Sequence, residues 1–342
     1  MNQFQPGVFG LFSNYAGYVL LGEEALPLSD LEMSRPTGRY ISRVVVQCLN
    51  ILAKKHSIRM VGNACAPGFL LPRPDANAGI GQFRFPDGTP CGALIINAKG
   101  QAETRDAVVF PAEPFMVLRI RNHWRTFDHY LQDMRSKYRA RARRALHCSE
   151  AIQSATLCGS QIDDVLLARC AALLAGTLRE KTIALSPDLA GMLRTFRDAF
   201  GADFCLHQYH DANGICGFVS SLRRGDRLMA MHLGYKVEGA KDTHLYQRMM
   251  YDLVRDAILH GHCELHMGRT ATEIKSTLGA EPVENSFVVF ARSLLLRKLT
   301  AWYKQFFFTP ATYTLRRPFH EEAANLRAER QGTEFLSVSL TA

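Results

Sequence analysis

The 342-residue sequence has no CxxC pair, no long apolar run and no basic residue before Arg35. Without a run of about 20 apolar residues, no membrane-spanning helix is expected. Without an early basic segment, no signal peptide is expected. The nine cysteines are scattered and odd in number, which predicts reduced thiols that pack as small apolar side chains. We therefore expect a cytoplasmic protein that is at most peripheral to the inner face of a membrane.

The composition is that of a chain that buries a core, with 47% hydrophobic and 21% charged residues. Its length allows two domains of ordinary size. The 41 Lys and Arg residues outnumber the 32 Asp and Glu residues and leave a net charge of +9. Such an excess favours an anionic partner, which is a nucleic acid, a phosphorylated co-substrate or an anionic membrane surface.

Periodicity and turn chemistry predict alternating strands and helices along most of the chain. The first 35 residues show no clear period, and we expect no regular element there. In the first half the pattern predicts a helix at 38–55 and strands at 57–62, 82–85, 91–97 and 108–120. In the second half it predicts strands at 203–210, 215–222, 228–235, 263–267 and 286–291, and helices at 245–259 and 270–278. The runs DGTPCGALII and ANGICGFVSS share a turn, a Cys-Gly pair and a strand, which predicts two related α+β units.

Three runs resemble one known family: LMAMHLGY, the longer HLYQRMMYDLVRDAILHGHCELHMGRTATEIKSTLGAEP, and the upstream HWRTFDHYLQDMRSKYRARARRAL. They are similar to tandem GNAT acyltransferases, the branch that includes the Fem aminoacyltransferases and acyl-CoA N-acyltransferases. The resemblance implies an α+β fold of two GNAT-like units, each a mixed, largely antiparallel sheet flanked by helices. It implies an N-terminal unit at 1–120, a basic linking helix at 121–150, a catalytic C-terminal unit at 151–291, and an amphipathic helix and tail at 292–342.

The resemblance also implies where an acyl donor binds. In this fold a backbone N–H beside a splayed strand receives the acyl oxygen, and the start of the next helix holds phosphates. The implied donor contacts are His232, Leu233, Gly234, Tyr235, Lys236, Lys241, Thr243 and His244. The loop before that helix departs from the family because it holds one glycine, Gly239, which leaves room for a donor other than acetyl-CoA. Acyl-CoA is expected as a co-substrate, with no resident cofactor.

The candidate catalytic residues are Glu264, His266, Tyr246, Lys275 and Arg269. With a strand period of two, His262, Glu264 and His266 point to one side, an arrangement that suits a metal or a general base. We favour Glu264 or His266 as the base and expect no metal. Lys275 and Arg269 would hold the donor or the oxyanion, and Tyr246 would protonate the leaving thiolate. Each also has a purely structural alternative: Lys275 would extend its amine to solvent, Arg269 would form a salt bridge at the helix end, and Tyr246 would pack half-buried. No cysteine has an obvious histidine partner, so direct transfer without an acyl-enzyme is expected.

Two further segments favour anionic and membrane partners. Six Lys and Arg residues lie between Arg135 and Arg144 with no acidic residue among them. Like charges at this spacing destabilise a helix, so an anion is expected to compensate them. Residues 292–308 form an amphipathic pattern with Leu295, Leu299, Trp302 and Phe306 on one face. This pattern is typical of an interfacial membrane helix and equally of a helix that closes the protein's own core.

The predicted function is an N-acyltransferase that moves an acyl group, long-chain and from acyl-CoA, onto a primary amine. The acceptor we favour is a membrane lipid amine such as a sphingoid base, as in bacterial ceramide synthases of this wider group. One alternative is a Fem-like transfer from aminoacyl-tRNA to a peptidoglycan precursor. The other is a GNAT-like binding module without catalysis.

Overall fold

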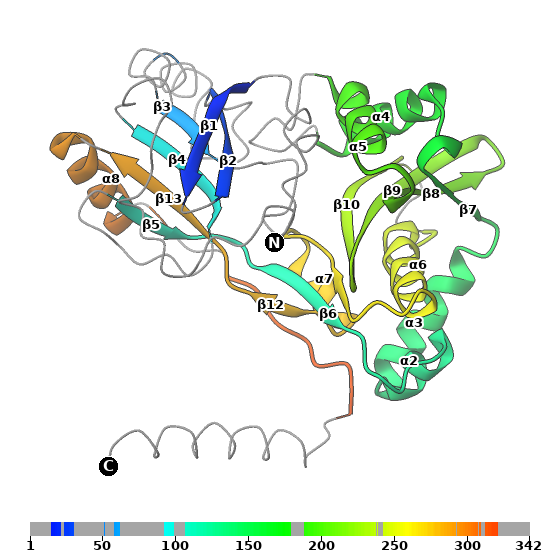
Figure 1. The fold of residues 1–342 in the computed structure, drawn as a ribbon. Coiled ribbons are helices and arrows are strands. Elements are labelled where there is room, and N and C mark those ends of the chain that lie inside the picture. Colours follow the sequence, from blue (N-terminus) through cyan, green and yellow to red (C-terminus); the bar gives the residue numbers. More distant parts are fainter. Residues whose placement is uncertain are drawn as a thin grey trace, which may run out of the picture.

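The computed structural model describes Ile51 and residues 108–178, 188–236, 238, 242–291, 293–306, 308 and 312–320 (Figure 1). In the first 107 residues it also describes the backbone of the strands β1 (Tyr15–Leu21), β2 (Glu24–Asp30), β3 (Ile58–Val61), β4 (Gly92–Ala98) and the start of β5 (Ala107–Pro111). The predicted helix at 38–55, apart from Ile51, and the predicted strand at 82–85 lie outside these residues. No helix among the described residues is long and apolar enough to cross a membrane.

The strands form two mixed sheets, which confirms the predicted α+β class. The first has the order β1-β2-β3-β4-β13-β5, with β13 at Ser286–Ala291. The second has the order β12-β6-β11-β10-β9-β8-β7. Its members are β12 (Glu281–Val283), β6 (Phe115–Arg119), β11 (Glu264–His266), β10 (Arg227–Tyr235), β9 (Gly214–Arg224), β8 (Phe204–Asp211) and β7 (Gln153–Cys158). Only β3–β4 and β10–β11 pair in parallel among the described strands.

Helices cover both faces of the second sheet, and each face has its own apolar core. On one face lie α2 (Phe127–Asp133), α3 (Ser136–Cys148) and α6 (Leu245–Leu259). On the other lie α4 (Asp164–Leu178) and α5 (Leu189–Phe200). Two short 3-10 helices, Gly159–Gln161 and Gly201–Asp203, adjoin β7 and β8. The remaining helices are α7 (Thr272–Thr277) and α8 (Leu294–Phe306), and α8 contacts β5 and β13 of the first sheet.

Local sequence accounts for the limits of these helices. In α6, Met249, Leu253 and Val254 are fully buried and recur at the spacing of one helix face. α5 begins where the Asp188 carboxylate accepts a hydrogen bond from the Gly191 N–H at 2.8 Å. It ends at Gly201, whose φ of +52° suits glycine.

An antiparallel ribbon joins the two sheets. β5 pairs with β13 in the first sheet, and β6 pairs with β12 in the second. Between them the Ala112 N–H donates to the Asn285 carbonyl at 2.9 Å, so the pairing continues across the gap (Figure 1). The predicted boundaries at residues 120 and 291 therefore do not match the sheets, because β6 and β13 each lie in the sheet of the other predicted unit. Whether the four predicted segments of the chain act as separate domains stays a prediction.

One prediction about the first half is wrong, and the sequence match behind another has a different meaning. Residues 15–30, for which we expected no regular element, form the hairpin of β1 and β2. The two similar Cys-Gly runs lead into strands with different neighbours: β4 has a parallel neighbour in β3, whereas both neighbours of β9 are antiparallel. The two runs therefore do not mark corresponding strands. The predicted pair of related units is nevertheless present, because both sheets repeat one pairing order. From β1 to β5 and from β8 to β12, successive neighbours are antiparallel, antiparallel, parallel, antiparallel and antiparallel.

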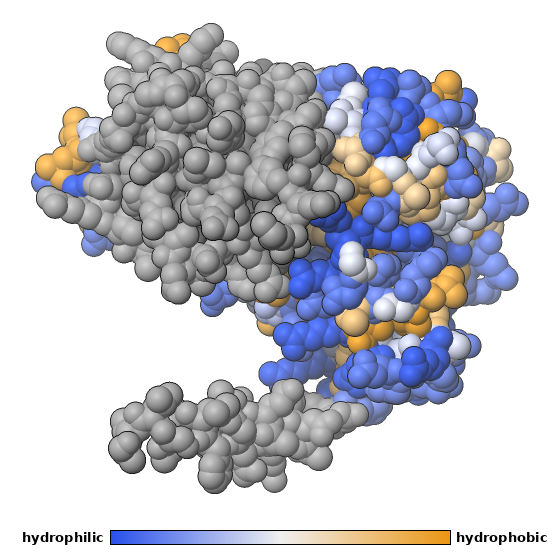
Figure 2. Space-filling view, in the orientation of Figure 1, coloured by the Kyte–Doolittle hydropathy of each residue, from blue (hydrophilic) through white to orange (hydrophobic). Residues whose placement is uncertain are grey.

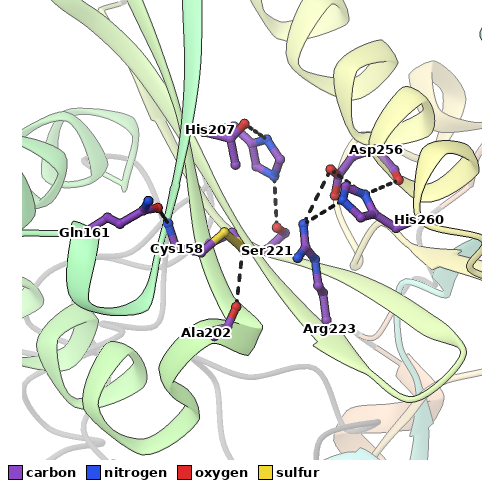
Figure 3. The surroundings of a disulfide bond; sticks show 10 residues. Cys158, Gln161, Ala202, His207, Ser221, Arg223, Asp256 and His260 are labelled. Carbon is purple, nitrogen blue, oxygen red and sulfur yellow. Dashed lines mark hydrogen bonds and ion pairs between the residues drawn. A yellow bond between two sulfur atoms is a disulfide. The ribbon is translucent and has the colours of Figure 1, made fainter.

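The cysteine prediction is wrong at one pair, because Cys158 of β7 and Cys205 of β8 form a disulfide bond (Figure 3). The two residues are direct partners in the antiparallel register, which brings their side chains together. Scattered spacing in the sequence does not reveal this register. Burial raises the pKa of the Cys170 thiol to about 12, as expected for a cysteine that packs as an apolar side chain.

The segment at 312–320 returns to the start of the second unit. The Arg135 N–H donates to the Pro318 carbonyl at 2.8 Å. The Phe319 ring packs 5.2 Å from the Trp124 ring and 5.8 Å from the Tyr130 ring, measured between centroids. Asp133, at the end of α2, accepts from the Trp124 indole at 2.7 Å. This segment therefore fixes the turn between α2 and α3.

Candidate functional site

The site is built around the point where β10 and β11 part. The two strands pair in parallel only from Arg227 to Met229, which lie opposite Glu264 to His266. β10 then continues to Tyr235 with a register shift between Ala230 and Leu233. A bulge of this kind bends a strand away from its neighbour. The strands predicted at 228–235 and 263–267 are therefore neighbours.

The parallel pairing fixes how far the candidate base lies from the predicted donor segment. Because the pairing is parallel, Cys263 lies beside the start of β10, at the end opposite to Tyr235. His266 is level with Met229, and Tyr235 lies six residues further on, which is about 20 Å along a strand. The candidate base and the far end of the predicted donor segment therefore do not meet at one point.

Glu264 and His266 form the central pair. The His266 Nε2 lies 2.9 Å from the Glu264 Oε2, which also lies 3.2 Å from the Arg227 Nε. Arg119 of β6 is the cross-strand partner of Glu264 on the other side. His266 is 4% exposed, and Leu265 points to the opposite face, into the core shared with α6. We call Arg227, Glu264 and His266 together the Arg227–Glu264–His266 cluster.

Arg269 and Lys275 form a second pair beyond β11. The Lys275 Nζ donates to the Arg269 carbonyl at 3.2 Å, and Lys275 is only 3% exposed. It therefore does not snorkel to solvent. Burial lowers the pKa of the Arg269 guanidinium, an effect that Glu113 opposes. α7 begins at Thr272, two residues after the predicted start of this helix at residue 270, because Ala271 has a φ of +54° that does not suit a helix.

Tyr246 and Tyr235 form a third pair, with ring centroids 6.4 Å apart. Both pack partly buried against the core that includes α6. Burial, and next the neighbouring Tyr235, raise the pKa of Tyr246 well above its usual value. The Tyr246 hydroxyl therefore keeps its proton at neutral pH and is a donor.

The segment 232–236 packs against α4 and α5. The His232 N–H donates to the Ser220 Oγ at 2.9 Å, and its ring meets the Phe196 ring edge-on at 5.1 Å. The Tyr235 N–H donates to the Thr177 Oγ1 at 3.2 Å. Two of the backbone groups predicted to receive the acyl oxygen are thus bonded within the protein.

The other predicted donor contacts follow on either side. Leu233 pairs with Val219 of β9 and is partly buried, and Gly234 lies directly against the backbone of α4. The Lys236 Nζ lies 3.9 Å from the Asp211 Oδ2. Thr243 is half-buried, and His244 precedes α6 with a φ of +50° and makes no side-chain capping bond to it. Lys241 lies outside the described residues.

The three residues predicted to share one side of the strand do not all do so. β11 begins at Glu264, and His262 lies in a different group with Arg223, Asp256 and His260. The ring centroids of His260 and His262 are 6.4 Å apart, and the His260 Nδ1 lies 3.1 Å from the Asp256 Oδ1 (Figure 3). Burial lowers the pKa of His262, which Asp256 opposes. Across the described ranges, no group of three or more His, Cys, Asp and Glu residues is arranged to hold a metal.

The predicted basic helix is present as α3, and its cations face solvent. Arg135, Lys137, Arg141, Arg143 and Arg144 are exposed, and Arg139 is half-buried and donates to the Gln132 carbonyl at 3.2 Å. Within the part of the chain that the structure describes, none of these six forms an ion pair with an acidic side chain. The helix therefore presents uncompensated positive charge.

Two functional candidates were missed by the sequence analysis. The first is Arg227. It begins the strand next to the one that begins at Glu264 and carries the opposite charge, but this pairing can be seen only once the two strands are aligned. Thr177 bonds the Tyr235 N–H from α4, a helix that the periodicity did not predict.

No protein-family model and no curated protein matches this chain. Solved structures do resemble it. L-PGS from Bacillus licheniformis has 11% identity, with 86% of this chain and 90% of that one covered and a TM-score of 0.44. FemX has 12% identity, with 81% and 86% covered and a TM-score of 0.44. A tandem GNAT protein from the clavulanic acid biosynthesis pathway has 13% identity, with 79% of each chain covered and a TM-score of 0.38. At these TM-scores we rest no conclusion on the likenesses.

Proposed function

We propose that this protein is an N-acyltransferase that moves an acyl group from acyl-CoA to a primary amine. The observation that carries the proposal is the Arg227–Glu264–His266 cluster at the point where β10 and β11 part. A carboxylate that accepts a hydrogen bond from an imidazole fixes the orientation of the ring and stabilises its protonated form, which makes the ring a stronger base. In this arrangement His266 is the base, Glu264 orients it, and Arg227 positions Glu264.

The reaction is a direct transfer. The amine nitrogen forms a bond to the thioester carbonyl carbon, the carbon–sulfur bond breaks, and the amine gives one proton to the His266 Nδ1. The CoA thiolate leaves and takes a proton from water, because Tyr246 packs against Tyr235 at the end of β10 that is far from His266. No covalent acyl-enzyme forms, so no cysteine is required.

Arg269 and Lys275 supply positive charge just beyond the base along the chain. Their role in the proposal is to hold the donor phosphates or to stabilise the oxyanion, which is worth roughly 3 kcal/mol per donor group. The start of α6 is the proposed phosphate contact, because its first-turn N–H groups are not capped by the His244 side chain. In the sequence, Lys236, Lys241 and Thr243 precede this helix.

The proposed substrates are a long-chain acyl-CoA and a membrane lipid amine such as a sphingoid base. The loop before α6 has a single glycine, Gly239, and is expected to bind the donor phosphates weakly. Burial of a long acyl chain would compensate, because each buried methylene contributes about 0.8 kcal/mol to binding. The net charge of +9 supports an anionic membrane surface as a partner. The proposed location is the inner face of the membrane, with the protein peripheral to it.

Substitution at the cluster tests the proposal. Glu264→Gln and His266→Asn should each lower kcat for acyl transfer by about 100-fold or more, the usual contribution of a general base. The affinity for acyl-CoA, measured by calorimetry, should change little. Glu281→Gln, at an exposed acid of β12, is the matched control and should keep kcat. Full activity of His266→Asn would exclude His266 as the base.

A Fem-like aminoacyl transfer from tRNA is the second candidate, and the uncompensated cations of α3 favour it. RNA would be held there through its phosphates, with affinity that falls steeply with salt. Binding of tRNA with a steep salt slope, together with no binding of palmitoyl-CoA, would replace our proposal with this one.

A GNAT-like binding module is the third candidate. The internal bonding of the His232 and Tyr235 N–H groups favours it, because these groups no longer face a substrate. Turnover of any acyl donor by the purified protein would exclude it.

A further inference from the structure

α8 has its apolar face turned away from the protein. Leu295, Leu299, Trp302 and Phe306 recur at the spacing of one helix face, and we call them the outer apolar stripe. They are 70%, 52%, 51% and 62% exposed, respectively. The Trp302 and Phe306 rings lie 5.9 Å apart. Figure 2 shows hydrophobic residues at the left edge of the molecule, where Figure 1 places α8.

The residues of α8 on the inner side are more polar. Those that are half-buried are Leu296, Arg297, Thr300 and Lys304. The helix contacts β5 and β13, and the Tyr303 ring lies 6.5 Å from the Phe110 ring. A helix that closes its own core shows the reverse order, with apolar residues inside and cations outside. α8 is therefore anchored to the first sheet while it presents its apolar stripe outward.

The charge of the helix indicates what covers this stripe. Residues 293–306 contain no Asp or Glu and three cations, Arg297, Lys298 and Lys304. Lys298 is exposed and precedes Leu299 of the stripe. Apolar side chains beside cations, with Trp and Tyr among them, complement the boundary between acyl chains and anionic headgroups. A second copy of the chain is a poorer fit, because each copy carries a net charge of +9.

We propose that the outer apolar stripe docks the protein on a bilayer that contains anionic lipid. From Leu295 to Phe306 the stripe runs about 16 Å, so α8 lies in the plane of the interface. α3 lies on the other side of the molecule, in the second unit (Figure 1), and stays available for a different anion. This inference deepens the membrane part of the proposed function. The membrane inference can be wrong while the proposed acyl transfer is right, because its test uses no acyl donor and no amine.

The fluorescence of Trp302 offers a direct test. The chain has two tryptophans, and Trp124 is only 3% exposed, so a change in emission on adding vesicles reports Trp302. Vesicles of phosphatidylcholine with about one third phosphatidylglycerol should shift the emission to the blue and sediment with the full chain, whereas pure phosphatidylcholine should bind more weakly. Trp302→Phe should remove the shift. Lys298→Glu should weaken the partition by roughly 30-fold, as expected for reversal of one charge at such a surface.

Paired substitutions separate the stripe from general surface apolarity. Leu295→Gln with Leu299→Gln should abolish vesicle binding. Val165→Gln with Leu259→Gln, at side chains that are 62% and 76% exposed elsewhere, should preserve it. Equal binding by both double variants, or no binding by the unaltered chain, would overturn the proposal. It would also be overturned by light scattering that shows a dimer which the first variant dissociates while no vesicles bind, because a second copy would then cover the stripe.

Discussion

Gly234, next to the end of β10, lies in direct contact with the backbone of α4. A Cβ atom added there would lie 2.5 Å from the Leu174 nitrogen and 2.7 Å from the Leu173 carbonyl carbon. Backbone atoms of a helix cannot rotate away as a side chain does, so Gly234→Ala must push α4 off the sheet. Overpacking of this kind costs about 1–3 kcal/mol. The same movement strains the bond between the Tyr235 N–H and Thr177, worth about 1 kcal/mol. We expect a total loss of roughly 2–4 kcal/mol.

Urea unfolding followed by circular dichroism measures this loss as a change in the free energy of unfolding. Gly176→Ala is the matched control, since an added Cβ in α4 there meets nothing within 4 Å. The control should be neutral or more stable by up to about 1 kcal/mol, because alanine favours a helix. An unfolding midpoint for Gly234→Ala equal to that of the unaltered chain would refute the packing of α4 on β10.

Further predictions concern four other sites. Burial lowers the pKa of His207, so its contribution to stability is complete above about pH 6.5 and should be lost as the pH falls below that value. Urea unfolding at several pH values should therefore show that the free energy of unfolding of His207→Gln depends less on pH than that of the unaltered chain. Cys158→Ser with Cys205→Ser should lower the free energy of unfolding by up to about 4 kcal/mol, from closure of a loop with a sequence separation of 47, and equal stability would count against a bond in solution. Cys263→Ser should keep kcat, and an acylated Cys263 in intact mass spectra would contradict direct transfer. Lys275→Ala should weaken acyl-CoA binding, turnover or both, and unchanged kinetics would remove it from the site.

The elements predicted correctly are those with strong local periodicity. The helix at 245–259 has the predicted limits, and the strands around 204–235 differ from them by one or two residues. α4 was missed because its apolar residues surround it almost evenly, with a mainly apolar sequence DVLLARCAALLAGTL and no clear face. The exchange of β6 and β13 between sheets was missed because strand order is a long-range property that periodicity does not encode.

The candidate site divides in the same way. The pairing of Glu264 with His266 follows from the period of a strand and was predictable. The distance from His266 to Tyr235 was not, because it depends on which end of β10 meets β11. The outer position of the apolar stripe of α8 was left open between two alternatives, since both give the same amphipathic pattern.

The central claim, transfer of an acyl group from acyl-CoA to a primary amine, is tested most directly by product analysis. Purified protein is incubated with palmitoyl-CoA and sphinganine, and the amide and free CoA are quantified by mass spectrometry beside His266→Asn. We predict equal amounts of amide and CoA from the unaltered chain and about 100-fold slower formation of both by the variant. Release of CoA without amide, or no reaction while tRNA binds the protein, would contradict the account.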